Sequence, residues 1–197
     1  MPSPNRRPPV RLPALLLAAA AGLAGCASHH AAPRSGSTPT YRKLLATPIA
    51  AGDLPAGVTG GAPVRADPNA TDRAYHVVGE VDVRLHGPDP VDMIEYVVFR
   101  SAADATADLA GGLRQDPRDH VTVAGRPAAG FDVPAHLYTV QVVVGGQPKG
   151  YYAHCAAIDG PVIAVGTAAA SPANPTGDST TACALAHAAL THLRALR

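Results

Sequence analysis

The sequence predicts an α+β fold: a mainly antiparallel, curved sheet with two helices packed on one face, a two-layer sandwich held by one disulfide. Three observations predict it. Apolar and polar residues alternate over residues 77–85, which indicates a half-buried strand. Short apolar segments in the second half of the chain are separated by turn sequences such as Asp159-Gly160, which are typical of antiparallel hairpins. Two segments, 101–113 and 178–196, begin with helix-capping residues and continue with apolar residues at helical spacing.

The first 26 residues have the layout of a leader for export. Residues 1–11 hold three arginines and no acidic residue, and the apolar stretch at 12–25 is shorter than the roughly 20 residues of a membrane-spanning helix. The stretch ends in Leu23, Ala24, Gly25 and Cys26. This segment resembles the bacterial lipoprotein signal peptide, whose lipobox is a leucine, two small residues and a cysteine. The resemblance implies cleavage before Cys26 and lipid attachment to its thiol, and an ordinary secretory leader is the alternative.

The remaining chain is expected to be a tether followed by one domain. Residues 26–40 are mostly small, polar or proline and have no apolar period, so we expect a flexible tether. Residues 41–197 have the length of a single α+β domain. Its first part, an arm at 41–74, contains so many prolines and glycines that little regular structure is expected beyond a short helix or a docked segment at residues 44–49. We expect this arm to cover one edge of the sheet as a loop.

The charge of the mature chain argues against a nucleic-acid partner. The whole chain has 16 Lys and Arg residues and 15 Asp and Glu residues. Three of the arginines precede Cys26 and every acidic residue follows it, so the mature chain has 13 basic and 15 acidic residues and a net charge of −2. Such a chain lacks the excess positive charge whose counter-ion release drives nucleic-acid binding.

Two strands follow the arm. In residues 77–85, apolar side chains alternate with Glu80, Asp82 and Arg84, so one face of this strand is expected to be buried and the other solvated. A turn at residues 86–90 precedes a second strand at 93–100, which is apolar on both faces. This pattern predicts a central strand that is antiparallel to the first and covered by helices on at least one side.

Helix and strand signals then continue to the end of the chain. Ser101, with Asp104 three residues later, has the spacing of a capping box and predicts the start of a short helix. Residues 121–133 predict two short strands or a hairpin, with the turn at 124–127. Three more strands are expected at 137–144, 150–158 and 162–167. A proline-rich loop leads to a final helix that Asp178 or Ser179 caps and that ends near Leu196.

Two cysteines remain beside Cys26: Cys155 on a predicted strand and Cys183 in the first turn of the last helix. Because an exported protein is in an environment that preserves disulfides, we expect a Cys155–Cys183 bond between helix and sheet. The alternative is a reactive thiol, with Cys183 activated at the helix N-terminus or Cys155 paired with its neighbour His154. Adjacent residues of a strand point to opposite faces, which argues against the second pairing.

The sequence contains no motif of an established catalytic or metal site. It has no Gly-x-Ser-x-Gly motif, no glycine-rich phosphate loop followed by a helix, and no zinc-binding helix motif. Glu80, Asp82 and Glu95 lie on predicted strands, and the first two share a face that is expected to be solvated. Seven histidines are expected at surface or partly buried positions: His76, His86, His120, His136, His154, His187 and His192. We therefore predict no catalytic residue, no cofactor and no metal ligand.

The layout of lipobox, polar tether, compact α+β domain and late cysteine pair is similar to that of secreted lipoproteins and extracellular sensor-type domains of actinobacteria. This resemblance implies a non-enzymatic domain that is lipid-anchored to the cell membrane, faces the extracytoplasmic side, and serves in ligand binding, sensing or an accessory role. We expect a small apolar ligand or an envelope protein as its partner, with a cleft between sheet and helices or under residues 50–74. The alternatives are an envelope enzyme with clustered histidines and carboxylates, with or without a metal, and a structural partner of another envelope protein.

Overall fold

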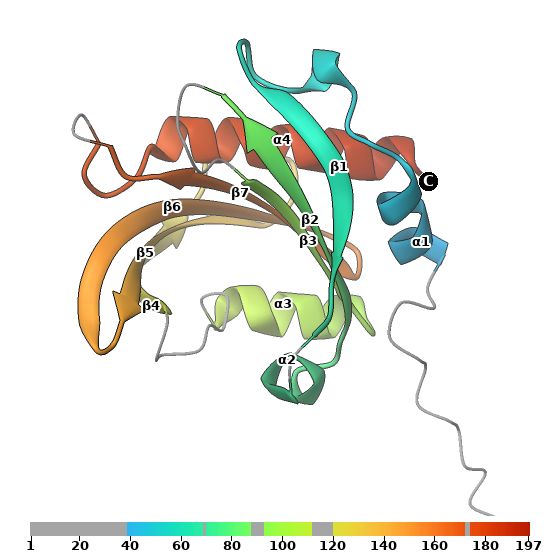
Figure 1. Ribbon diagram of the computed structural model, residues 1–197. Coiled ribbons are helices and arrows are strands. Elements are labelled where there is room, and N and C mark those ends of the chain that lie inside the picture. The colour runs from blue at the N-terminus through green and yellow to red at the C-terminus, as the bar shows by residue number, and fades with distance from the viewer. Residues whose placement is uncertain (1–38, 69, 88–92, 112–119, 172–173) are drawn as a thin grey trace, which may run out of the picture. The chain divides into compact units, whose positions relative to one another are not determined.

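The computed structural model describes residues 39–197 except 69, 88–92, 112–119 and 172–173 (Figure 1). In this part of the chain, seven strands form one antiparallel sheet in the order β1-β2-β3-β7-β6-β5-β4. The strands are β1 (Thr59–Ala66), β2 (Val77–His86), β3 (Met93–Phe99), β4 (His120–Pro127), β5 (Ala135–Val144), β6 (Gln147–Asp159) and β7 (Val162–Ala169). The helices are α1 (Pro39–Ala46), α2 (Ala70–Ala74), α3 (Ala102–Ala110) and α4 (Ser179–Ala195), with a 3₁₀ turn, η1, at Ala51–Asp53. The predicted α+β class and antiparallel sheet are confirmed.

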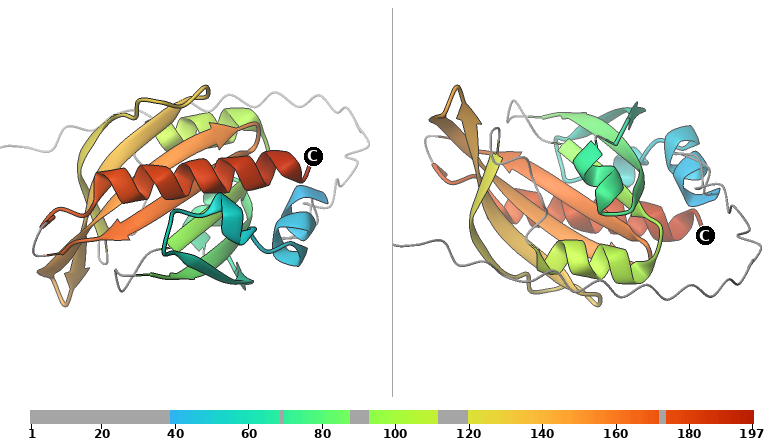
Figure 2. Two further views of the ribbon diagram at one scale, coloured as in Figure 1. Left: turned by 90° about the horizontal axis from the view of Figure 1, so that it is seen from above. Right: turned by 90° about the horizontal axis from the view of Figure 1, so that it is seen from below.

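The predicted two-layer arrangement is wrong, because α3 and α4 lie on opposite faces of the sheet (Figures 1 and 2). On β3, Tyr96 is buried in the core on the α4 side, whereas Phe99 is buried with Leu109 of α3. The Tyr96 hydroxyl donates a hydrogen bond to the Ala189 carbonyl of α4 at 3.3 Å. The physical reason is that β3, β6 and β7 are apolar on both faces, so each face needs a helix to exclude water.

The arm at residues 41–74 contains a strand that the sequence does not predict. β1 pairs with β2 at the edge of the sheet, so the arm covers this edge as expected, but as a strand and not as a loop. The pairing register shifts between Gly60 and Pro63, which is where a proline is tolerated in a sheet. A Cβ atom on Gly61 would lie 2.9 Å from the Arg84 carbonyl oxygen, so the close approach of β2 requires glycine there.

Residues 121–133 form one strand and a loop, and the predicted turn at 124–127 is wrong. β4 runs through this position and pairs with β5 up to Pro127, opposite His136. Gly125 is part of the strand, where a Cβ atom would lie 2.9 Å from the ring of Tyr138. The glycine leaves room for a neighbouring aromatic ring and does not mark a turn.

Both helix caps predicted from the sequence are confirmed. The backbone N–H of Asp104 donates to the Ser101 hydroxyl at 3.2 Å at the start of α3. At the start of α4 the Asp178 carboxylate accepts from the backbone N–H groups of Thr180 at 2.9 Å and Thr181 at 3.3 Å. Of the two residues considered, Asp178 is therefore the cap.

The Cys155–Cys183 disulfide is also confirmed, and it joins β6 to α4 with a Cα–Cα distance of 4.9 Å. Next to it, α4 lies so close to β7 that a Cβ atom on Gly166 would be 2.2 Å from the Ala182 carbonyl oxygen. The start of α4 is thus fixed on the sheet by a covalent bond and by a close backbone contact.

The predicted signal peptide, Cys26 and residues 27–38 of the tether lie outside the described residues. Among the residues that the structure describes, no helix has the length and apolar composition needed to cross a membrane.

Candidate functional site

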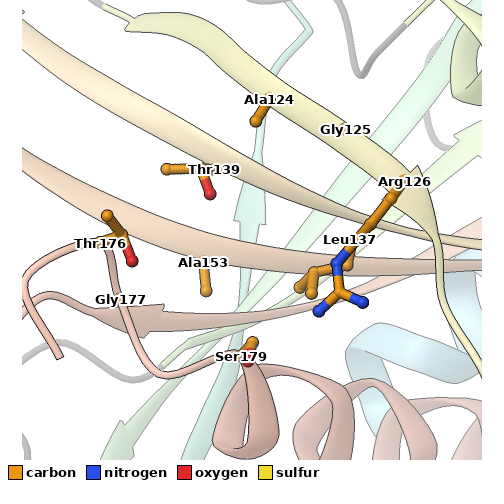
Figure 3. A pocket seen from close by; sticks show the side chains of 9 residues that line it. All are labelled: Ala124, Gly125, Arg126, Leu137, Thr139, Ala153, Thr176, Gly177 and Ser179. Carbon is orange, nitrogen blue, oxygen red and sulfur yellow. The ribbon is translucent and has the colours of Figure 1, made fainter.

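A pocket of about 200 Å³ lies between strands β4–β6 and the start of α4 (Figure 3). It is on the face of the sheet that α4 covers. The described residues that line it are Ala124, Gly125, Arg126, Leu137, Thr139, Ala153, Thr176, Gly177 and Ser179. These residues come from β4, β5, β6, the loop before α4, and α4 itself, so only the folded chain brings them together.

The strand register explains why the pocket is open at this place. Ala124, Thr139 and Ala153 are direct cross-strand partners on three adjacent strands, and their side chains therefore point to the same face. Two of the three are alanines, which leave space above the sheet. Two residues further along each strand, Arg126 lies opposite Leu137. Their side chains therefore point to the same face and also reach this space.

The loop before α4 forms the other side of the pocket. Gly177 has φ +90°, and a Cβ atom there would lie 2.2 Å from the backbone nitrogen of Ala153. Only glycine allows both this backbone conformation and this close approach to β6. With the Cys155–Cys183 bond a short way along α4, the loop and the first turn of the helix are held rigidly over the strands.

The pocket presents hydrogen-bond donors that no other described residue uses. The Arg126 side chain extends over Leu137 toward Ser179 (Figure 3). The guanidinium of Arg126 and the hydroxyls of Thr139, Thr176 and Ser179 form no hydrogen bond or ion pair within the described part of the chain. The Asp178 carboxylate, by contrast, is occupied by α4, and its hydrogen bond from the Thr181 hydroxyl lowers its pKa.

A second, shallower depression lies between η1 and α4 and has a volume of about 400 Å³. Its described lining residues are mainly apolar or small, with one histidine and one carboxylate: Asp53, Leu54, Pro55, Ala184, His187, Ala188 and Thr191. This depression is at one of the two places where the sequence predicts a cleft, next to residues 50–74, and the Arg126 pocket is at the other, between sheet and helix. It is more open than the Arg126 pocket and has fewer groups that could orient a ligand.

Three carboxylates lie together on the α3 face of the sheet, and the expectation that Glu80 and Asp82 face solvent is wrong. Asp82 of β2 is directly opposite Glu95 of β3, and all three side chains are half-buried. Burial raises the pKa of Glu95 to about 8, with a further contribution from the nearby Glu80 and Asp82. Burial likewise raises the pKa of Glu80 to about 7 and that of Asp82 above its usual value.

The histidines are distributed over the fold. His76 is hydrogen-bonded to Asp104 at 2.7 Å, His136 is hydrogen-bonded to the Tyr138 hydroxyl, and the His187 ring stacks on Phe131. His154 and His192 are buried, and burial lowers the pKa of His192. Within the described ranges, no three His, Cys, Asp or Glu side chains come together in a way that could hold a metal ion.

Sequence reasoning does not identify the residues of the Arg126 pocket as a site. The sequence predicts a turn at Arg126 and a helix cap at Asp178 or Ser179, and Thr139 and Thr176 belong to no motif. The glycine at 177, directly before the helix cap, is the one local sign that the chain approaches another segment closely there. Comparisons of the chain with protein-family models, with curated proteins and with solved structures return no match.

Proposed function

We propose that this protein is a lipid-anchored domain on the extracytoplasmic side of the cell membrane that binds a small polar molecule in the Arg126 pocket. The observation that carries the proposal is a cavity of about 200 Å³ whose polar groups have no protein partner among the described residues. Ligand sites combine such a preformed concave surface with a few convergent polar groups. The lipobox resemblance at residues 23–26 supports the anchor and the location.

The chemistry of the lining supports binding over catalysis. The described lining residues include no histidine, cysteine or carboxylate, and the Asp178 carboxylate next to Ser179 is held by hydrogen bonds from Thr180 and Thr181, so the lining offers its hydroxyls no general base. The pocket is also held on both sides, by the β4–β5–β6 register and by the disulfide at α4. A rigid pocket loses little conformational entropy when a ligand binds, which favours affinity.

The expected small apolar ligand stays a prediction, and the depression between η1 and α4 offers the apolar surface for it. The Arg126 pocket supports a polar ligand instead, because its described lining places one guanidinium and three hydroxyls around a small space. We therefore base the proposed function on the Arg126 pocket.

A fragment titration tests this proposal. Neutral, anionic and cationic fragments would be added to ¹⁵N-labelled protein, and the amide resonances of Gly125, Arg126, Gly177 and Ser179 would be followed. We expect at least one fragment to shift these resonances in a saturable way. An Ala124→Leu variant, which fills the pocket from β4, should abolish the shifts. Ala129→Leu, an exposed alanine in the loop after β4, is the matched control and should bind as the unmodified protein does.

The proposal is refuted if no fragment of any charge shifts these four resonances. It is equally refuted if the fragments bind the Ala124→Leu variant as tightly as the unmodified protein. Circular dichroism spectra of both variants would establish that each retains the fold.

A further inference from the structure

We infer that the ligand of the Arg126 pocket carries an oxyanion, a carboxylate or a phosphate group, which the Arg126 guanidinium binds together with neighbouring hydroxyls. This inference rests on the proposed function and specifies the chemical class of its ligand. It is argued from the charge of the pocket, the donors around it, and its size.

The charge of the pocket is positive. Arg126 is the one charged residue among the described lining residues. Arginine stays protonated at every physiological pH, and its planar donor group matches the two oxygens of a carboxylate or phosphate. The fold shows this geometry elsewhere: Arg194 binds both carboxylate oxygens of Asp132, at 3.0 and 3.1 Å. Arg126 has the same capacity, and no carboxylate of the described chain uses it.

The hydroxyl groups add donors from three further segments. Thr139 lies on β5, Thr176 in the loop before α4, and Ser179 in the first turn of α4. In Figure 3 these side chains and Arg126 border the same space from different sides. Each hydroxyl can donate one hydrogen bond, and an oxyanion can accept several. The backbone N–H groups of Thr180 and Thr181 do not take part in binding the oxyanion, because they already donate hydrogen bonds to the Asp178 carboxylate.

The size of the pocket limits the rest of the ligand. Its volume of about 200 Å³ is below the roughly 300–1,000 Å³ of pockets for drug-sized ligands. An oxyanion with a few additional carbon and oxygen atoms matches this volume, which is too small to enclose a whole lipid acyl chain. The aliphatic part of the Arg126 side chain and Leu137 provide a small apolar contact for those carbons.

Anionic probes and their neutral counterparts test the inference. The protein would be titrated by calorimetry and by amide resonance shifts with glycerol 3-phosphate and with succinate, at constant ionic strength. Glycerol and succinamide are the neutral counterparts of these two anions. We expect at least one anion to bind at the pocket and its neutral counterpart to bind about tenfold more weakly or not at all, as the loss of a charge-assisted hydrogen bond requires.

Substitutions of Arg126 then test whether this residue binds the anion. Arg126→Gln should weaken anion binding about tenfold or more, and Arg126→Lys, which keeps the charge but loses the two-pronged geometry, should weaken it less. Lys149→Gln removes the same charge from an exposed residue of β6 outside the pocket and should leave binding unchanged. Thermal unfolding of each variant would verify that the fold is retained, and Arg126→Lys remains informative if Arg126→Gln unfolds.

The outcomes separate the two proposals. If anions and neutral counterparts bind equally well at the pocket, or if Arg126→Gln binds anions as before, the oxyanion inference is wrong while the proposed binding function stands. If Lys149→Gln weakens binding as much as Arg126→Gln, the effect is one of net charge and the inference is again wrong. If neither these probes nor the fragment set reaches the pocket, both proposals fail.

Discussion

Replacing Glu95 with glutamine should make the protein more stable near neutral pH. Glu95 is half-buried on β3, opposite Asp82, and burial with the neighbouring carboxylates raises its pKa from 4.5 to about 8. At pH 7 the folded protein therefore holds a proton on Glu95, whereas the unfolded chain does not. Glutamine has nearly the same shape and cannot ionise, so the variant avoids the cost of protonating this group.

The magnitude follows from linkage between proton binding and folding. A group that binds a proton on folding lowers the free energy of unfolding by about 1.36 kcal/mol for each pH unit above its unfolded pKa, until the pH reaches its folded pKa. From 4.5 to pH 7 this gives an upper bound of about 3 kcal/mol for Glu95. The partial solvent exposure of its side chain reduces this value. The sign is definite: stability should fall as the pH rises from about 5 to 8.

Urea unfolding followed by circular dichroism at pH 5, 6, 7 and 8 measures this effect. The advantage of Glu95→Gln over the unmodified protein should be small at pH 5 and should grow with pH. Asp53→Asn, which removes an exposed carboxylate in η1, is the control for the change in net charge. Equal pH dependence of Glu95→Gln and the unmodified protein would show that Glu95 ionises alike in the folded and unfolded states, and would refute the reasoning.

Four further variants test other features of the chain. Thr167→Val should raise the free energy of unfolding by about 1 kcal/mol, measured in urea, because it removes a buried hydroxyl that has no hydrogen-bond partner among the described residues. Gly166→Ala should lower it by about 3 kcal/mol, since the new methyl group overlaps the α4 backbone; an unchanged value would mean that α4 packs less closely. Replacing both Cys155 and Cys183 with alanine should cost about 3 kcal/mol in the same assay. Cys26→Ala should move the protein from the membrane fraction to the soluble fraction and abolish its labelling by palmitate.

The elements that the sequence predicts well are those whose burial follows from local pattern. β2 and α4 each carry a clear apolar period, β3 is apolar on both faces, and both helix caps depend on residues within three positions of each other. The sequence does not reveal β1, because Gly61 and Pro63 interrupt the apolar alternation that is typical of a strand. An edge strand tolerates these two residues. The placement of α3 and α4 on opposite faces of the sheet is not visible in the sequence, because the apolar face of a helix does not specify which face of the sheet it covers.

The candidate site depends still more on long-range structure. Arg126 and Thr139 come together through strand register, and Ser179 joins them only because α4 lies on the same face of the sheet. None of these contacts is local in sequence. The carboxylates show the same limit: the alternation that places Glu80 and Asp82 on one face is visible in the sequence, but their raised pKa values depend on burial in the folded sheet.

The strand order has a consequence for how the chain folds. The sheet consists of two meanders, β1-β2-β3 and β4-β5-β6-β7, whose one shared border within the described sheet is the pairing of β3 with β7. The paired residues of β3 and β7 lie 64 to 74 positions apart in the sequence, so closing this border carries a large loop entropy and is expected late in folding. Both half-cystines lie in the second meander and the helix that follows it. Oxidation can therefore join β6 to α4 before the first meander docks on β7, so formation of the disulfide does not require a complete sheet.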